Sequence, residues 1–320
     1  MLSPGVSAWN ADETMLLIYR TGAAAPGHVV LSTATGELLT EVDLSPPDIE
    51  QVYWDPTTSG RLVAFENDAL WSFDVASAER TSIPLVDGCS NADAGYPSPP
   101  SAAGLLPTFC DSDNGRMLQL VDLADGTQRT VAAPADADAV IAVGRLVVVT
   151  AGDGAVTVFD EQLIANGALV DLDNEAFVAG SRDGEPVAIA ARFGGDAIGS
   201  VVVHPLDGST PTVVVGPDAG NEYPPSGTQL SAVADRIVFS TRGPVTGELA
   251  GRVVLVDVAG GGAPIVGTFE HGSAGTFDNW STVFVSLSPT GRYLAWSSDS
   301  GGDRVDTFIS DFSEVPEFPP

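Results

Sequence analysis

The stretch SLSPTGRYLAWSSDSGG, residues 286–302, decides the fold because the chain repeats its pattern. A Ser-Pro-Thr-Gly corner precedes an arginine and an apolar run that ends at Trp296. Proline fixes φ and glycine tolerates positive φ, so the corner predicts a tight turn, and the run after it predicts a buried strand. Residues 60–65 and 144–149 repeat the glycine, the arginine and the apolar run. A recurring unit of this kind indicates architecture rather than a solitary serine-rich active-site loop.

Seven apolar runs of this type cover the chain, at residues 15–19, 60–65, 105–109, 144–149, 186–190, 235–239 and 291–296. A β-branched run follows each one, at residues 28–31, 70–73, 117–120, 156–159, 201–204, 253–256 and 306–309. Corners with glycine then lead, in most units, to a further strand such as 37–44 or 212–215. The second runs are 38 to 53 residues apart, near the roughly 40–50 residues of a propeller blade.

The fold class predicted from this period is all-β, a seven-bladed β-propeller with antiparallel blades of three to four strands. No segment of ten or more residues shows the capped helical period that a parallel βαβ fold requires. Residues 1–312 are expected to form a single domain, followed by a Pro-rich C-terminal tail at 313–320. Only residues 1–5 precede the first strand, so either the last blade has three strands or its fourth comes from further upstream.

The corner at residues 286–299 resembles the first strand connection of TolB-like propellers, in which serine, proline, aspartate and glycine precede a run ending in an aromatic residue. Residues 53–65 form a longer copy and residues 9–19 a looser one, and Thr290 stands where the family usually has aspartate. The resemblance implies a TolB-like or WD-repeat-like propeller over the whole chain. It implies no catalytic residue, because that superfamily hosts many functions.

Charge excludes several classes of partner. The chain has 43 Asp and Glu residues against 13 cationic residues, all arginine, and a net charge of −30. Such a surface repels nucleic acid and anionic membranes, and no apolar run approaches the roughly 18–20 residues of a membrane span. We therefore expect no nucleic acid partner, no membrane insertion, and a monomeric, soluble bacterial protein of high-GC or salt-adapted origin. An acidic face that recruits cations or a basic partner is the alternative.

Propeller topology relates the two cysteines. With the strands of a blade named a to d in chain order, the b-to-c loops and the d-to-a connections emerge on one face. Cys89 lies in a d-to-a connection and Cys110 at the end of the following strand b, so a disulfide is expected, with two free thiols as the alternative. Its closure entropy is worth about 3 kcal/mol. A disulfide implies a secreted or cell-envelope protein, although residues 1–5 lack the features of a signal peptide.

The same sorting places the long segments 86–93, 192–199, 216–227, 242–251, 269–281 and 298–304 on that one face, as is typical of a binding surface on a rigid scaffold. The ligand-binding candidates there are Tyr96, Glu222, Tyr223, His271, Asp278, Asn279, Trp280, Asp299 and Asp303. Aromatic residues beside Asp and Asn are typical of sugar-binding surfaces. The alternative is that Trp280 and Tyr223 only cover the core. Trp54, Trp71 and Trp296 lie within strand runs and are expected between blades.

Catalytic and metal motifs are weak. The three histidines lack metal-ligand spacing, and no nucleophile elbow or phosphate loop occurs. No cofactor is expected, although a structural calcium ion stays open at residues 111–115 or beside Asp299 and Asp303. We predict a non-catalytic extracellular or envelope module that binds carbohydrate or protein. The alternatives are a propeller glycoside hydrolase or polysaccharide lyase, with acids and histidine at the channel mouth, and an envelope assembly scaffold resembling TolB.

Overall fold

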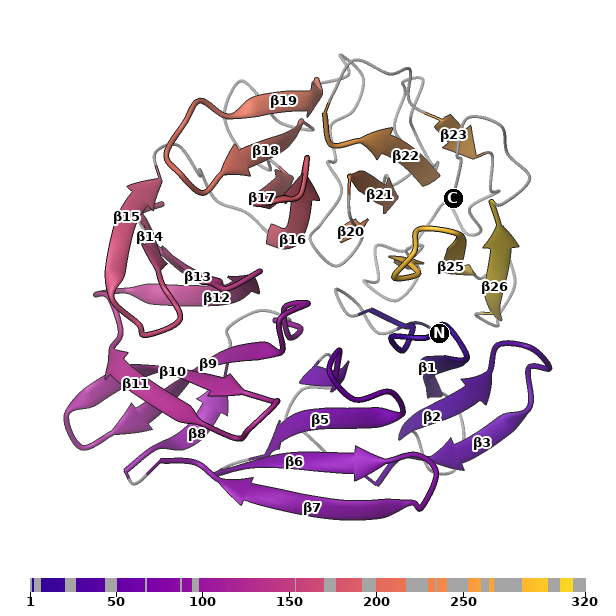
Figure 1. Ribbon diagram of the computed structural model, residues 1–320, viewed down its shortest axis with the longest axis horizontal. Coiled ribbons are helices and arrows are strands. Elements are labelled where there is room, and N and C mark those ends of the chain that lie inside the picture. Colours follow the sequence, from indigo (N-terminus) through magenta and orange to yellow (C-terminus); the bar gives the residue numbers. More distant parts are fainter. Residues whose placement is uncertain are drawn as a thin grey trace, which may run out of the picture. The chain divides into compact units, whose positions relative to one another are not determined.

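The computed structural model describes residues 2, 7–20, 27–43, 51–66, 68–86, 88–93, 98–152, 154–169, 177–191, 200–216, 230–233, 235–240, 253–259, 265–267, 284–298 and 306–312. These residues form 26 β-strands in seven antiparallel sheets, each of which we call a blade (Figure 1). The chain divides into two compact units, Trp9–Leu172 and Met1–Ala8 with Asp173–Pro320. The first unit holds blades 1 to 4 and the second holds blades 5 to 7.

In the first unit, blade 1 has three strands, and Trp9 forms an isolated antiparallel bridge with Leu16 of the first of them. Its strands are β1 (Met15–Arg20), β2 (Gly27–Ser32) and β3 (Leu38–Glu41). Blade 2 has β4 (Val52–Trp54), β5 (Arg61–Glu66), β6 (Ala69–Asp74) and β7 (Glu79–Pro84). Blade 3 has β8 (Ser90–Asp93), β9 (Leu105–Ser112), β10 (Gly115–Asp122) and β11 (Gln128–Ala132). Blade 4 has β12 (Ala137–Val143), β13 (Leu146–Ala151), β14 (Val156–Phe159) and β15 (Ala165–Leu169).

The second unit continues the same up-and-down order. Blade 5 has β16 (Phe177–Arg182), β17 (Glu185–Ala191), β18 (Val201–Pro205) and β19 (Thr212–Val215). Blade 6 has β20 (Leu230–Val233), β21 (Arg236–Ser240), β22 (Val253–Asp257) and β23 (Ile265–Gly267). Blade 7 has β24 (Phe284–Leu287), β25 (Tyr293–Ser298) and β26 (Asp306–Asp311). Within the described residues, blade 7 is therefore one strand shorter than blades 2 to 6.

The strands agree with the sequence pattern. Every run predicted to be a strand b or a strand c forms that strand, from β1 and β2 through to β25 and β26. All neighbouring strands in each sheet are antiparallel. The predicted all-β class and the seven blades of three to four strands are confirmed. The single domain over residues 1–312 and the tail at 313–320 stay predictions.

Apolar side chains fill the space between neighbouring blades within each unit. One cluster joins blades 1 and 2 around Trp54, and others join blades 3 to 4, 5 to 6 and 6 to 7. Trp54 is buried, while Trp71 and Trp296 are partly buried against the clusters of their blades. The tryptophans expected between blades from the sequence therefore contribute to these contacts.

The corner of the opening stretch is structural. The Ser288 hydroxyl accepts the Tyr293 amide at 3.0 Å, and the Gly291 amide donates to Ser288 O at 2.7 Å, with Gly291 at φ 71°. Asn10 and Ser101 accept the first amide of strand b in the same way, at 2.9 and 3.4 Å. Because three blades use the same cap before strand b, this corner is part of the repeat and not a site of its own.

The arginines of the repeat also hold the blades together. Arg61 pairs with buried Asp55 in its own corner and donates to Leu123 O of blade 3 at 3.0 Å. Arg236 of blade 6 donates to Gly291 O of blade 7 at 3.2 Å. These contacts lie at the end of the blades where strand a joins b and strand c joins d, which we call the corner face. The opposite end, where b joins c and d joins the next strand a, is the loop face.

Candidate functional site

All nine ligand-binding candidates lie outside the described residues. They fall in four segments of the chain: Tyr96 follows β8, Glu222 and Tyr223 lie between β19 and β20, His271 to Trp280 lie between β23 and β24, and Asp299 and Asp303 lie between β25 and β26. Their mutual positions stay predictions. The strands that flank these segments are described and fix where each segment begins and ends.

The flanking strands of blades 6 and 7 lie next to one another. The Leu287 amide of β24 donates to the Ser231 hydroxyl of β20 at 3.2 Å, which joins the inner strands of the two blades. Within blade 7, Phe284 is paired with Ser297, and Ser298 with Asp306. Three segments that carry eight of the nine candidates are thus attached to one group of neighbouring strands, all at the loop face.

Small buried serines line the loop-face ends of these blades. Ser200 before β18, Ser240 at the end of β21 and Ser297 near the end of β25 are each at most 1% exposed. The Ser297 hydroxyl has no hydrogen-bond partner within the described part of the chain. Buried hydroxyls are usually satisfied by protein, ordered water or ligand, so this end of blade 7 has a polar group available for a further contact.

Tyr96 requires a correction to the predicted loop before it. The segment 86–93 was expected to be a d-to-a loop, but β8 already begins at Ser90, which pairs with Asp111 of β9. The reason is the neighbouring disulfide at Cys89, which holds this part of the chain against strand b. Tyr96 therefore follows an inner strand and does not lie in the connection between blades 2 and 3.

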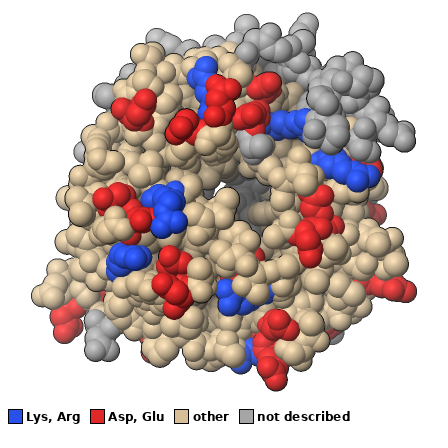
Figure 2. Space-filling model, viewed as in Figure 1, with Lys and Arg blue, Asp and Glu red and all other residues tan. Residues whose placement is uncertain are grey.

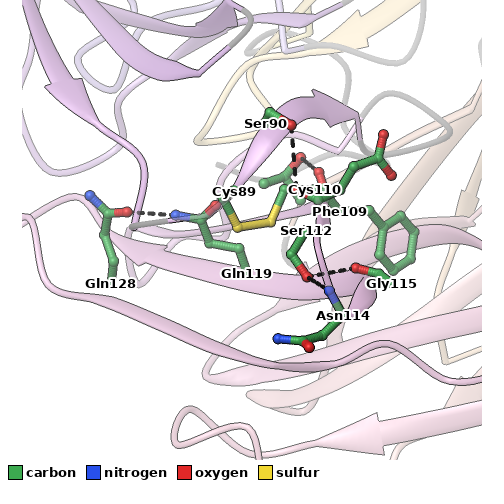
Figure 3. Close-up of a disulfide and its surroundings, with 11 residues drawn as sticks. Cys89, Ser90, Phe109, Cys110, Ser112, Asn114, Gly115, Gln119 and Gln128 are labelled. Atoms are coloured by element: carbon green, nitrogen blue, oxygen red, sulfur yellow. Dashed lines mark hydrogen bonds between the residues drawn. A yellow bond between two sulfur atoms is a disulfide. The ribbon is translucent and has the colours of Figure 1, made fainter.

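The Cys89–Cys110 disulfide expected from the topology is present, with Cα atoms 5.3 Å apart and a sequence separation of 21. Figure 3 shows it beside Gln119, whose Nε2 donates to Gln128 Oε1 at 2.5 Å. Gln128 Nε2 in turn donates to Pro84 O of β7 at 2.8 Å. The disulfide and this glutamine pair together connect the end of blade 2 with the sheet of blade 3.

The tryptophans that the structure describes already have packing partners. Trp9 and Trp54 are buried. Arg80 lies 3.8 Å from the centroid of the Trp71 ring, and Trp296 stacks on Phe308 with centroids 4.3 Å apart. Of the five tryptophans in the sequence, Trp280 alone lies outside this part of the chain, so it is the one that stays a candidate for an open stacking platform.

The described histidines and acids do not form a metal site. His28 and His204 are 3% and 1% exposed, and no group of three or more His, Cys, Asp or Glu side chains within the described ranges could hold a metal ion. At residues 111–115, Ser112 Oγ accepts the Asn114 amide at 3.2 Å and donates to Gly115 O at 2.8 Å. These bonds are those of a β-hairpin turn, the alternative to a calcium loop.

Several described carboxylates have turn-capping roles. The Thr14 hydroxyl, with Ser59, lowers the pKa of Asp12 to about 2. Hydrogen bonds from Ser77 lower the pKa of Asp74, and those from Ser209 lower the pKa of Asp207. A general acid needs a pKa near the working pH, so these three carboxylates are poorly suited to proton donation and well suited to holding turns.

Described arginines lie beside acids and carbonyl groups. Arg20 pairs with Glu41 at 3.0 Å, and Arg116 donates to Ala137 O at 2.6 Å while it lies 4.2 Å from the Phe109 ring centroid. Figure 2 shows acidic and arginine side chains next to one another on the face in view. These arginines take part in local structure, and none of their contacts indicates an anion-binding site.

Sequence comparisons identify no family: no protein-family profile matches the chain, and no curated protein matches it. No helix in the described residues has the length and apolar character needed to cross a membrane. The TolB-like resemblance therefore stays a prediction.

Comparison of structures gives matches over nearly the whole chain. An oligogalacturonate lyase in complex with manganese is 12% identical, with a TM-score of 0.67 and coverage of 97% of this chain and 89% of that one. The oligogalacturonate lyase of Vibrio parahaemolyticus is 11% identical, with a TM-score of 0.65 and coverage of 98% and 90%. The Neurospora crassa Pan2 WD40 domain is 11% identical, with a TM-score of 0.60 and coverage of 96% and 88%. At these identities the similarity concerns the fold, and the chain has the architecture of a seven-bladed β-propeller.

Proposed function

We propose that this protein is a non-catalytic binding module of a bacterial cell envelope or secretome that recognises carbohydrate or protein through its loop face. The observation that supports this most is the common attachment of three candidate-bearing segments to β20, β24, β25 and β26. The Ser231–Leu287 bond joins the inner strands of blades 6 and 7, and the Ser298–Asp306 pairing joins the loop-face ends of β25 and β26. Binding residues on loops held by a rigid sheet scaffold are a frequent arrangement.

Carbohydrate is the ligand class that the sequence of these segments favours. Trp280 is preceded directly by Asp278 and Asn279, which supply planar hydrogen-bonding groups beside an aromatic ring. The described tryptophans already have packing partners, so we assign this role to Trp280. A calcium ion between Asp299 and Asp303 is part of the proposal, because carboxylates are ligands that calcium prefers. The disulfide supports an extracytoplasmic location.

A polysaccharide lyase is the second candidate. Two proteins that share the fold are oligogalacturonate lyases, one of them in complex with manganese. In this chain the groups for such chemistry would be His271 and Asp278, with Glu222 and the Asp299–Asp303 segment around them. This candidate requires that these side chains converge on one bound uronate chain.

One experiment separates the candidates. The protein is tested on an array of glycans and acidic polysaccharides that includes oligogalacturonate, with calcium, with manganese and with chelator. The same array is run with Trp280→Ala and with Phe308→Ala, a control that removes an exposed aromatic ring whose packing partner is Trp296. We expect binding to fall at least tenfold with Trp280→Ala and to be unchanged with Phe308→Ala.

Other outcomes change the conclusion. If the protein produces unsaturated oligogalacturonate and His271→Ala abolishes that production, the protein is a lyase and not a binding module. An inert array, together with a protein ligand whose binding Trp280→Ala weakens, would make protein the ligand class and support the TolB-like scaffold. If a glycan binds and Trp280→Ala has no effect, the loop-face assignment is wrong.

A further inference from the structure

Blade 3 has a polar inner strand that makes few contacts with its own sheet. β8 reads Ser-Asn-Ala-Asp, and Asn, Asp and Ser favour turns over strands. Two pairs join it to β9, Ser90 with Asp111 and Asp93 with Phe109, and the register between them is irregular. By contrast, the inner strands β4 and β24 are buried along their whole length, and β12 pairs with its neighbour at six positions. Burial and pairing therefore stabilise β8 less than they stabilise those three strands.

The edge of β9 that faces β8 also offers few hydrogen-bond donors. The Ser101 amide donates to Leu105 O, so the odd-numbered residues of β9 face the inner side of the blade and the even-numbered residues face β10. One odd position is Pro107, which has no N–H. The amides of β9 that can pair with β8 are therefore those of Phe109 and Asp111.

The disulfide sets the register of this short pairing. Cys89 immediately precedes Ser90, and Cys110 immediately precedes Asp111, so the crosslink places the first pair of β8 and β9 next to each other. The two strands are therefore held at the point where their pairing begins.

The described bonds on either side of β8 hold the chain to blade 2 and not to β9. The Leu85 amide donates to Asp68 O, and the Ser98 amide donates to the Tyr53 hydroxyl of β4, each at 3.0 Å. Without the crosslink, two residue pairs would have to offset the conformational entropy lost in ordering every residue between these two anchors. We therefore expect β8 to separate from β9 when the disulfide is open.

The burial of the two cysteines points the same way. Cys89 is 9% exposed and Cys110 is 1% exposed. A thiol enters a disulfide by attacking the disulfide of an oxidant, which must come within bonding distance of the sulfur. With β8 in place that approach is obstructed. A separated β8 carries Cys89 with it, because this cysteine immediately precedes the strand, and so gives an oxidant access.

We propose that β8 is an oxidation-dependent strand, which separates from β9 while the two thiols are free and pairs with it when the Cys89–Cys110 disulfide forms. The oxidant is a protein or small-molecule disulfide. The Cys89 thiolate attacks one sulfur of this disulfide, whose other sulfur leaves as a thiolate. The Cys110 thiolate then attacks Cys89 Sγ and displaces the oxidant's remaining sulfur. Two electrons and two protons pass from the cysteines to the oxidant, which becomes a dithiol.

The change has a consequence for maturation. Because disulfides form and persist outside the cytoplasm, a secreted or cell-envelope protein would complete blade 3 only after it leaves the cytoplasm. The ligand of the loop face plays no part in this change of β8, which is measured without one.

Amide hydrogen exchange, resolved by NMR, compares the oxidised protein with the same chain kept reduced by a phosphine. β9 supplies its own control, because Phe109 and Asp111 face β8 while Thr108 and Cys110 face β10. In the reduced protein we expect Phe109 and Asp111 to be protected at least about a hundredfold less than Thr108 and Cys110, with little dependence on low urea, as for a local opening. In the oxidised protein the four amides should be protected to within about tenfold of one another. Comparing amides of one strand removes the effect of a lower overall stability.

Blade 4 provides a matched control without a disulfide. The Gly152 amide donates to Asp136 O, so Val148 and Thr150 of β13 face the inner strand β12, whereas Val149 faces β14. On reduction, the protection of Val148 and Thr150 relative to that of Val149 should change less than about threefold.

A single-thiol variant tests the separation by a second route. In Cys110→Ser, Cys89 has no partner for a disulfide, and iodoacetamide should modify it at a rate within about tenfold of the rate in urea-unfolded protein. If β8 stays in place, Cys89 keeps the 9% exposure that it has beside its partner and reacts far more slowly. The exchange measurement uses the unmodified chain, so it decides the question even if this variant does not fold.

Three results would overturn the proposal. Equal protection of Phe109 and Thr108 in the reduced protein would show that β8 pairs without the disulfide. Loss of protection at Val148 relative to Val149 would show that reduction loosens inner strands in general. Slow alkylation of Cys89 in a folded Cys110→Ser variant would show that the cysteine stays buried without its partner.

Discussion

Reducing the Cys89–Cys110 disulfide should destabilise blades 2 and 3 by a predictable amount. Its sequence separation is 21 residues. A crosslink closing a loop of that length lowers the entropy of the unfolded chain, which raises the free energy of that state by about 3 kcal/mol. Both cysteines are buried, so substitution by alanine would add a cavity cost. For a unit of the size of Trp9–Leu172, about 3 kcal/mol corresponds to a fall in Tm of roughly 6 to 12 °C.

The matched comparison is oxidised against reduced protein, because the two forms have identical side chains. Urea unfolding should give a lower midpoint for the reduced form and a steeper dependence on urea, since an unfolded chain without the crosslink exposes more surface. The Cys89→Ala/Cys110→Ala variant should be at least as unstable as the reduced protein. Mass spectrometry after alkylation without reductant should find no modified cysteine in the oxidised form.

Two results would refute this reasoning. If both thiols are alkylated without reductant, the disulfide does not form and the argument for an extracytoplasmic protein loses its support. If oxidised and reduced proteins unfold at the same urea concentration, the crosslink does not constrain the unfolded chain in the way that the loop-entropy estimate requires.

Three further predictions concern the corner face. Asp55→Asn removes the buried partner of Arg61 and should lower the free energy of unfolding by about 3 kcal/mol in urea; an effect below about 1 kcal/mol would show that the pair is not structural. Gly104 has φ 80°, and an added Cβ would lie 2.5 Å from Thr57 Cγ2. Gly104→Ala should therefore lower the free energy of unfolding by about 1–3 kcal/mol. Adding Thr57→Ser, which removes that methyl group, should restore part of the loss in the same urea assay. The pKa of Asp12 is about 2 in the folded protein, below its unfolded value near 4. The ionised Asp12 carboxylate therefore stabilises the folded state above pH 4, and this contribution is lost as the pH falls toward 2. Because the site is exposed, the contribution is less than about 1 kcal/mol. Asp12→Asn should make the urea midpoint less dependent on pH between pH 4 and pH 2. If the midpoints of the variant and the unmodified protein fall in parallel over that range, the assignment is wrong.

The b and c strands could be predicted because their information is local. Each is a short apolar or β-branched run next to a glycine corner, and the same order recurs in every unit. The inner strands are harder: β8 reads Ser-Asn-Ala-Asp and is a strand because it pairs with β9 beside the disulfide. Its polar sequence carries no strand signal, so the segment was predicted as loop.

The contacts between blades are also invisible to a local pattern. Arg61 was recognised as part of a repeat, but its bond to Leu123 O spans 62 residues and depends on how blade 3 packs against blade 2. The corner acceptors differ in type among Asn10, Ser101 and Ser288, so the sequence shows the Asn10 corner only as a looser copy and does not show the Ser101 corner. For the loop face, topology predicts which strands flank the candidates, whereas the side-chain positions depend on loop conformation that strand periodicity does not encode.

The division between the two faces has a consequence for how stability and binding depend on sequence. At the corner face, charged groups are committed to bonds that hold neighbouring blades, such as Arg236 with Gly291 O and Asp12 with Ser59. Changing one of them leaves its partner unsatisfied, so its effect appears first in the free energy of unfolding. The loop-face candidates instead lie in the segments that connect the strands, and none of the bonds between blades within the described residues involves them. Trp280→Ala and Asp278→Ala should therefore shift stability by less than about 0.5 kcal/mol while abolishing ligand binding, which would place recognition and stability on opposite ends of the same blades.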